Sequence, residues 1–131
     1  AAIDILKADR IQHGVLAIED PDLISKLAQT KICLDVCPSS NIQLSVFSKI
    51  GDHPLPELIK AGVTCTIGSD DPLLFGPNLI EEYQTCRNNM GLDDQTIAQL
   101  AKNSFRYSGA PLAIKTYGYS EIDKWLSADN K

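Results

Sequence analysis

Three short strand-like segments, each followed by a helical pattern, constrain the fold of this 131-residue sequence more than any other feature. The strands are expected at residues 9–15, 31–37 and 62–68, where β-branched and other apolar residues gather. This alternation of strand and helix indicates right-handed crossovers and a parallel sheet. Parallel sheets are normally covered on both faces, and three strands make a poor independent one. We therefore predict an α/β fold that belongs to a larger protein.

Helix start signals follow the predicted strands. Asp20 is a suitable N-cap, and the proline after it suits the first helical position. Further helices are expected to begin near Pro54, at residues 77–78, after residues 93–94 and at Ser120, the last a short one through Trp125. Residues 1–8 have the pattern of the last turns of a helix. Together these signals place helices between and after the three strands.

The charge balance and the cysteines limit the possible partners and the compartment. Twelve basic residues and seventeen acidic ones give a net charge of −5, which argues against binding nucleic acid. No stretch approaches the roughly 18–20 consecutive apolar residues of a membrane span, so no membrane partner is expected. Four cysteines (Cys33, Cys37, Cys65 and Cys86) are expected to be reduced thiols of a cytoplasmic protein.

Polar residues follow all three predicted strands. His13-Gly14 ends the first strand, residues 37–41 follow the second, and residues 69–72 follow the third. In parallel α/β proteins, ligands bind at the carboxyl ends of the strands. The sequence therefore predicts one active site that is built from these three segments.

The chemistry of the individual side chains is open from their residue types alone. Asp70 and Asp71 repel each other, and a cation or firm hydrogen bonds would keep both ionised. Equally, they fit a helix N-cap and first turn before Pro72. His13 could be a base, a metal ligand, an electrostatic stabiliser or a structural residue. His53 is expected to lie in a turn and to cap a helix.

The strings at these positions together resemble the adenosine deaminase family of the amidohydrolase superfamily, whose members are metal-dependent (β/α)₈ barrels. The matching strings are R-I-Q-H-G at residues 10–14, C-P-S-S-N at 37–41, D-H-P at 52–54, S-D-D-P-L-L-F-G at 69–76, E-Y at 82–83 and A-K-N-S-F at 101–105. The resemblance implies that residues 1–131 form the C-terminal part of a TIM-like (β/α)₈ barrel, namely its last three βα units and terminal helices. A whole barrel needs roughly 250 residues, so an N-terminal barrel segment is expected to be missing.

The resemblance also implies a reaction and three residue roles. The intact protein is expected to deaminate a 6-aminopurine, with Zn²⁺ as cofactor and adenosine as the preferred small-molecule substrate, giving inosine and ammonia. Asp70 is similar to the aspartate that binds the zinc and orients its water. His13 is similar to the histidine that holds the attacking hydroxide, and Asp71 to the aspartate that hydrogen-bonds a purine ring nitrogen. Residues 37–41 match a motif that supports the site.

The departures from the family pattern are equally informative. The family's His-x-His pair, its third histidine and its proton-donating glutamate have no counterpart here. Catalytic zinc usually has at least three protein ligands, so this chain by itself is not expected to hold the ion or to be active. Three alternatives remain open: an adenine or aminodeoxyfutalosine-type deaminase, a non-catalytic barrel relative, and a receiver-like phosphoacceptor module.

Overall fold

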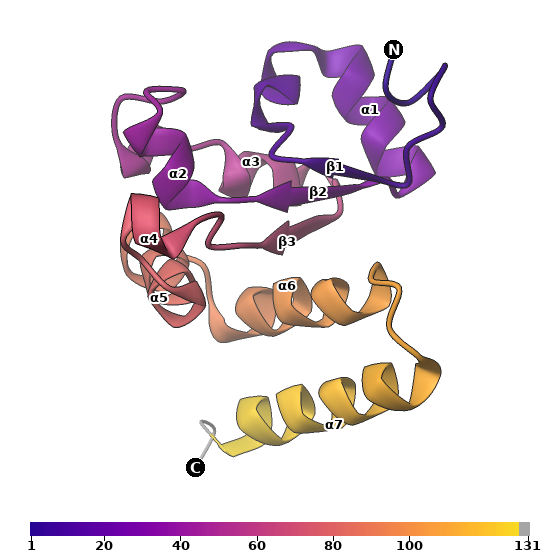
Figure 1. Cartoon of the computed structure of the whole chain (residues 1–131), viewed down its shortest axis with the longest axis vertical. Coiled ribbons are helices and arrows are strands. Elements are labelled where there is room, and N and C mark those ends of the chain that lie inside the picture. Colours follow the sequence, from indigo (N-terminus) through magenta and orange to yellow (C-terminus); the bar gives the residue numbers. More distant parts are fainter. Residues whose placement is uncertain (129–131) are drawn as a thin grey trace.

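A three-stranded parallel sheet forms the centre of the computed structural model, which describes residues 1–128 (Figure 1). Its strands are β1 (Arg10–Gln12), β2 (Cys33–Val36) and β3 (Cys65–Ile67), in the order β1-β2-β3. Asp35 lies opposite Gln12 on one side and Thr66 on the other. The predicted α/β class with three parallel strands is confirmed.

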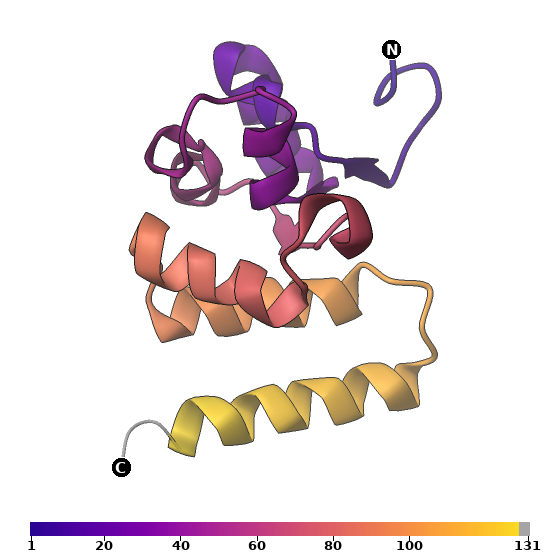
Figure 2. The same ribbon diagram turned by 60° about the vertical axis from the view of Figure 1, so that its left-hand side comes forward.

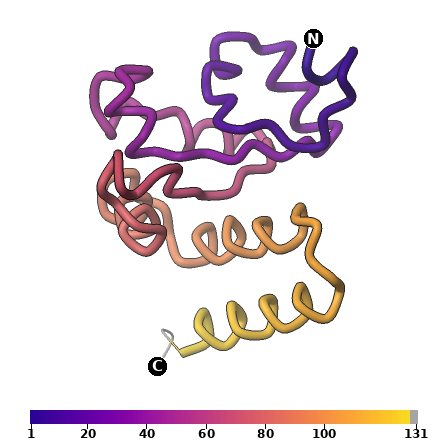
Figure 3. Tube along the Cα trace, in the orientation of Figure 1, coloured from indigo at the N-terminus to yellow at the C-terminus, as the bar shows by residue number. Residues whose placement is uncertain are grey.

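Helices connect the strands and extend beyond the last one. They are η1 (Val15–Glu19), α1 (Pro21–Thr30), α2 (Pro38–Gln43), η2 (Ile50–Asp52), α3 (Leu55–Lys60), α4 (Pro72–Phe75), α5 (Leu79–Met90), α6 (Asp94–Arg106) and α7 (Leu112–Ala128). In Figures 1 and 3, α1 lies above β1, α6 lies below β3, and α7 lies beyond α6. In Figure 2, α5 crosses in front of α6 on that side of the sheet, and α7 lies beyond both.

Local capping chemistry sets most helix starts where the sequence predicts them. The Asp20 carboxylate accepts two N–H groups in the first turn of α1, and Asp93 accepts the Thr96 N–H in the first turn of α6. Asn78 and Glu81 form a reciprocal capping box at the start of α5. Gly91 then ends α5 in a left-handed conformation, with φ of 70°.

The apolar core lies between the sheet and the helices that pack on it. Its buried side chains include Leu27, Leu34, Val36, Leu55, Leu58, Cys86 and Leu100. All four cysteines are buried and free, as expected of structural thiols. Within residues 1–128, no helix is both long and apolar enough to cross a membrane.

The first strand is shorter than predicted, and the difference shapes the site. β1 ends at Gln12, because His13 and Gly14 adopt left-handed φ angles of 58° and 72°. The His13 N–H still donates to the Asp35 carbonyl, at 2.8 Å, before the chain turns into η1. The imidazole therefore stands on a turn beyond the strand rather than on a strand face.

Two predictions about the ends of the chain are wrong. Residues 1–8 form turns rather than a helix, and Lys7 has a left-handed φ of 53°, outside the range of a helix interior. The last helix begins at Leu112, after Pro111, and runs through Ser120 without interruption. The edge-to-face contact of Tyr119 with Phe105 holds this stretch along α6, so Ser120 caps nothing.

Candidate active site

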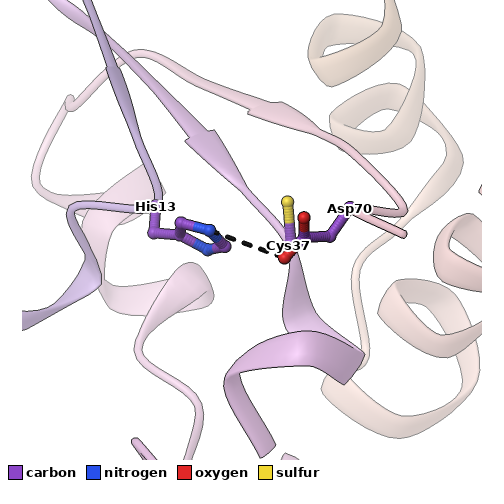
Figure 4. Close-up of side chains that lie close together, drawn as sticks. All are labelled: His13, Cys37 and Asp70. Carbon is purple, nitrogen blue, oxygen red and sulfur yellow. Dashed lines mark ion pairs between the residues drawn. The ribbon is translucent and has the colours of Figure 1, made fainter. Parts of the chain in front are cut away.

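The turns after β1 and β3 bring His13 and Asp70 together, as the parallel sheet predicts. The Nε2 atom of His13 lies 3.6 Å from the Oδ2 atom of Asp70 (Figure 4). About one third of each side chain is exposed. The pair is therefore open to a ligand from the carboxyl ends of the strands.

Both residues adopt a left-handed backbone conformation that residues other than glycine rarely adopt. The φ angle is 58° at His13 and 56° at Asp70. Such left-handed residues cost free energy and concentrate at functional sites, where the surrounding contacts hold them. Here the conformation turns the two side chains toward each other at the end of the sheet.

The short helix α2 supplies the groups that hold the pair. The Ser40 hydroxyl donates to Asp70 Oδ2 at 2.7 Å. The Asn41 side-chain nitrogen lies 3.2 Å from Nδ1 of His13. Ser40 and Asn41 are both buried, so the two groups that hold the pair have little contact with water. The sequence indicates that this motif lies at the site, but the individual partners follow only from the structure.

Cys37 is the third group of this cluster that could contact a metal ion. Ligand atoms of His13, Cys37 and Asp70 all lie within 4.8 Å of one another. Burial, with the nearby Asp70 and Glu82 carboxylates, raises the pKa of the Cys37 thiol to about 11. Its sulfur donates toward the Asp35 carbonyl, at 3.9 Å. The geometry thus combines one carboxylate, one imidazole and one neutral thiol.

Asp71 lies next to this cluster and begins α4. One of its carboxylate oxygens accepts the Leu73 N–H at 3.0 Å, so the N-cap of α4 is Asp71, one residue later than the predicted order of cap and first-turn carboxylate. The side chain is exposed. A capping aspartate keeps its second oxygen for another donor, and this is compatible with a ligand contact in addition to the cap.

His53 helps to hold the site in place. The sequence pattern, which placed it in a turn, did not indicate this role. Only 4% of the residue is exposed, and burial lowers its pKa to about 4. Its Nε2 lies 3.1 Å from the Asn41 side-chain oxygen, and its Nδ1 accepts the Leu55 N–H at 3.2 Å. The predicted role at the start of a helix is thus confirmed, and a link toward His13 is added to it.

A second buried carboxylate, Asp35, joins the three strands just below the site. Its oxygens accept hydrogen bonds from Arg10 on β1, Thr66 on β3 and Gln12, the last at 3.0 Å. Only 6% of Asp35 is exposed, and the arginine compensates its charge. A charged residue inside an apolar strand was the one sequence signal for this network.

Glu82 of α5 anchors the start of α2 from below. The residue is fully buried, and its Oε2 accepts the Ser39 N–H at 3.3 Å. Its other oxygen has no partner among the described residues. Burial accordingly raises the pKa of this carboxyl above its usual range. Glu82 therefore helps to position the motif that holds His13 and Asp70.

The comparison with protein families decides the identity of this arrangement. The sequence model of the family described as adenosine deaminase matches residues 1–125. The chain belongs to the adenosine deaminase family. This assignment also replaces the alternative of a receiver-like signalling module.

Relatives of the family carry the names of several purine deaminases. The chain is 41% identical over 130 residues to adenine deaminase of Cupriavidus necator, covering 99% of this chain and 37% of that protein. It is 41% identical over 127 residues to aminodeoxyfutalosine deaminase of Streptomyces avermitilis, covering 97% of this chain and 36% of that protein. The chain thus spans little more than a third of the length of these relatives.

Solved structures confirm that the fold is part of a larger deaminase architecture. The crystal structure of adenine deaminase from Arthrobacter aurescens matches with a TM-score of 0.93 and 35% identity, covering 96% of this chain and 38% of that one. An amidohydrolase of Burkholderia ambifaria, determined with bound Zn, has a TM-score of 0.81 and 21% identity, covering 97% and 38%. The second likeness concerns the fold alone.

Proposed function

We propose that the full-length protein is a zinc-dependent hydrolase that removes the amino group of a 6-aminopurine. The pairing of His13 with Asp70, 3.6 Å apart at the strand ends, carries this proposal. Membership of the adenosine deaminase family and relatives named as purine deaminases support it. The products would be ammonia and the corresponding 6-oxopurine. The four free thiols support a cytoplasmic location.

The donor set fits a zinc ion that is bound by Asp70. Zinc prefers carboxylate, imidazole and thiolate ligands, and an open Asp70 carboxylate meets this preference. Ser40 engages only one of its oxygens, Oδ2. Catalytic zinc usually has three protein ligands, so further ligands would come from residues outside this chain.

Each of three residues of this chain would then have a separate role in the reaction. Zinc bound at Asp70 would lower the pKa of a coordinated water to about 7 and so supply hydroxide at neutral pH. The Asp70 carboxylate would take up the proton of that water. His13 would donate from its imidazole to the attacking oxygen and stabilise the charge that develops there. The exposed oxygen of Asp71 would bind a purine ring nitrogen.

We expect the protein to recognise its substrate mainly through the 6-aminopurine ring. The sequence pattern favours adenosine as the first substrate to test. The relative at 41% identity over 130 residues is named adenine deaminase, which favours adenine as the second candidate. The name of another relative adds aminodeoxyfutalosine. All three share the amino group that the site would remove.

Replacement of Asp70 by alanine in the full-length protein tests the proposal. Deamination should fall by at least about 1,000-fold, because the residue would hold the metal and accept the proton of the water, and the bound zinc should decrease in parallel. Asp9→Ala is the matched control, because Asp9 is also exposed but precedes the opposite end of β1. Near-normal turnover by the Asp70→Ala protein would overturn the assignment. A wild-type protein that deaminates none of the three purines would favour a non-catalytic relative.

A further inference from the structure

Three groups form a continuous hydrogen-bonded chain that ends on the imidazole of His13. The backbone N–H of Leu55 donates to Nδ1 of His53, at 3.2 Å. Nε2 of His53 lies 3.1 Å from the Asn41 oxygen, and the Asn41 nitrogen lies 3.2 Å from Nδ1 of His13. Asn41 and His53 are 2% and 4% exposed, so water cannot replace either partner.

The direction of every bond in this chain follows from its first member. A backbone N–H can only donate, so Nδ1 of His53 carries no proton and its Nε2 must carry one. That Nε2–H needs an acceptor, and this places the oxygen of Asn41 toward His53. The amide nitrogen of Asn41 therefore points to His13 and donates to its Nδ1. The orientation of the amide is thus set by the backbone at Leu55 rather than by Asn41 itself.

We propose that Asn41 and His53 are positioning residues that fix the tautomer of His13. Because Nδ1 of His13 accepts from Asn41, the single proton of the neutral ring is held on Nε2. This nitrogen is the one that faces Asp70 Oδ2, at 3.6 Å. His13 therefore presents an N–H donor to the site. With the opposite tautomer it would present a lone pair to a carboxylate.

This row of hydrogen bonds also shows how one substitution can move the proton of His13 without creating a cavity. Aspartate at position 41 has nearly the same shape as asparagine, but both of its oxygens only accept hydrogen bonds. One oxygen would still accept from His53, and the other would require a proton on Nδ1 of His13. Asn41→Asp should therefore place a proton on the nitrogen that is bare in the wild type.

The first experiment measures the tautomer directly. The ¹⁵N chemical shifts of His13, in metal-free full-length protein labelled at histidine and assigned by His13→Asn, distinguish a protonated from a bare ring nitrogen. We expect a bare Nδ1 and a protonated Nε2 in the wild type, and a protonated Nδ1 in Asn41→Asp. A protonated Nδ1 in the wild type, or unchanged shifts in the variant, would overturn the proposal.

The second experiment measures the consequence for turnover, and in this respect the inference rests on the proposed deaminase function. Asn41→Asp should lower kcat by about 100-fold while KM changes much less, because ligand-orienting partners typically contribute 10–100-fold. His53→Gln can still present an N–H to Asn41, whereas His53→Phe fills the space without a donor. We expect His53→Gln to retain most of kcat and His53→Phe to lose about tenfold.

The two experiments separate failure of this inference from failure of the proposed function. Equal kcat losses in His53→Gln and His53→Phe, at unchanged melting temperature, would contradict the positioning role even in an active deaminase. If the Asn41→Asp protein unfolds, the wild-type shifts and the two His53 variants still decide. If the wild type deaminates no purine, the ¹⁵N shifts still confirm or overturn the tautomer, because they are read without metal or substrate.

Discussion

Two regions of this molecule are held together by different kinds of interaction. The strand-end cluster comprises His13, Ser40, Asn41, His53 and Asp70, and directional hydrogen bonds join its members. Two of its residues have left-handed backbones, which would relax without those bonds. The positions of the five side chains are therefore set by polar geometry.

The helices α6 and α7 are joined mainly by van der Waals contacts between side chains. Gly118 of α7 faces Phe105 of α6 so closely that an added Cβ would lie 2.5 Å from the ring. Phe105 also contacts Tyr119 edge to face, with centroids 6.4 Å apart. One exposed ion pair, Lys102 with Asp123, bridges the two helices. The tight contact of Gly118 with Phe105, rather than a buried polar network, thus sets how closely α7 approaches α6.

This difference indicates which changes should destabilise each region. The strand-end cluster should respond to pH and to changes of single polar atoms, because its bonds depend on protonation and direction. The helix pair should respond to volume at Gly118, because an added methyl group has no space there. Four measurements test the contrast, in decreasing order of the expected effect.

The largest change in unfolding free energy is expected when the pH is lowered and His53 becomes protonated. Burial lowers its pKa from 6.5 to about 4, so the unfolded chain binds the proton more readily than the folded one. The stability that its neutral form contributes is complete above pH 6.5 and is lost as pH falls toward 4. The loss should be about 3 kcal/mol. Urea unfolding from pH 7 to pH 4 measures it.

His53→Gln is the control for that titration, because glutamine keeps a donor but has no proton to gain in this range. The difference in unfolding free energy between the two proteins should shrink as the pH falls. Parallel curves for wild type and variant would contradict a buried neutral His53.

Gly118→Ala should give the next effect, in the helix pair. Helix propensity alone favours alanine by roughly 0.5–1 kcal/mol. The contact with Phe105 opposes this gain, because overpacking typically costs about 1–3 kcal/mol. We expect a net loss of about 1 kcal/mol in chemical unfolding, with little dependence on pH. Adding Phe105→Leu should recover part of the loss, and a stabilised Gly118→Ala protein would show that packing does not limit this contact.

Ser40→Ala tests the cluster at a single hydroxyl group. Its loss leaves Asp70 Oδ2 without the 2.7 Å hydrogen bond, so the carboxylate should be less well oriented. We expect zinc affinity of the full-length protein to fall about tenfold, measured by chelator competition. Ser40→Thr retains the hydroxyl and should stay close to wild type. Equal affinities for all three proteins would exclude a role for this bond.

Asp123→Asn should have the smallest effect. The ion pair with Lys102 is largely exposed, with 59% of the aspartate side chain accessible. Such pairs contribute about 0.2–1 kcal/mol and are screened by salt. We expect the variant to lose less than about 0.5 kcal/mol at low salt and nothing at high salt. A larger loss that salt does not reduce would mean that polar bonds also position α7.

The sequence determined those features that depend on near neighbours in the chain. Caps at Asp20, Asn78 and Asp93 were predictable, because each side chain binds N–H groups two or three residues away. The meeting of His13 with Asp70 was also predictable, because parallel strands end at one edge of a sheet. Local patterns failed at Ser120, where packing on α6 outweighs a capping signal.

The tertiary structure alone decided which side chains hold the site. Ser40 bonds to Asp70 across 30 residues, and Asn41 to His13 across 28. Asp35 collects donors from residues 23 to 31 positions away in both directions. No local pattern encodes these partners, because a hydrogen bond depends on distances of tenths of an ångström. Such distances are defined only when the strands and helices have packed.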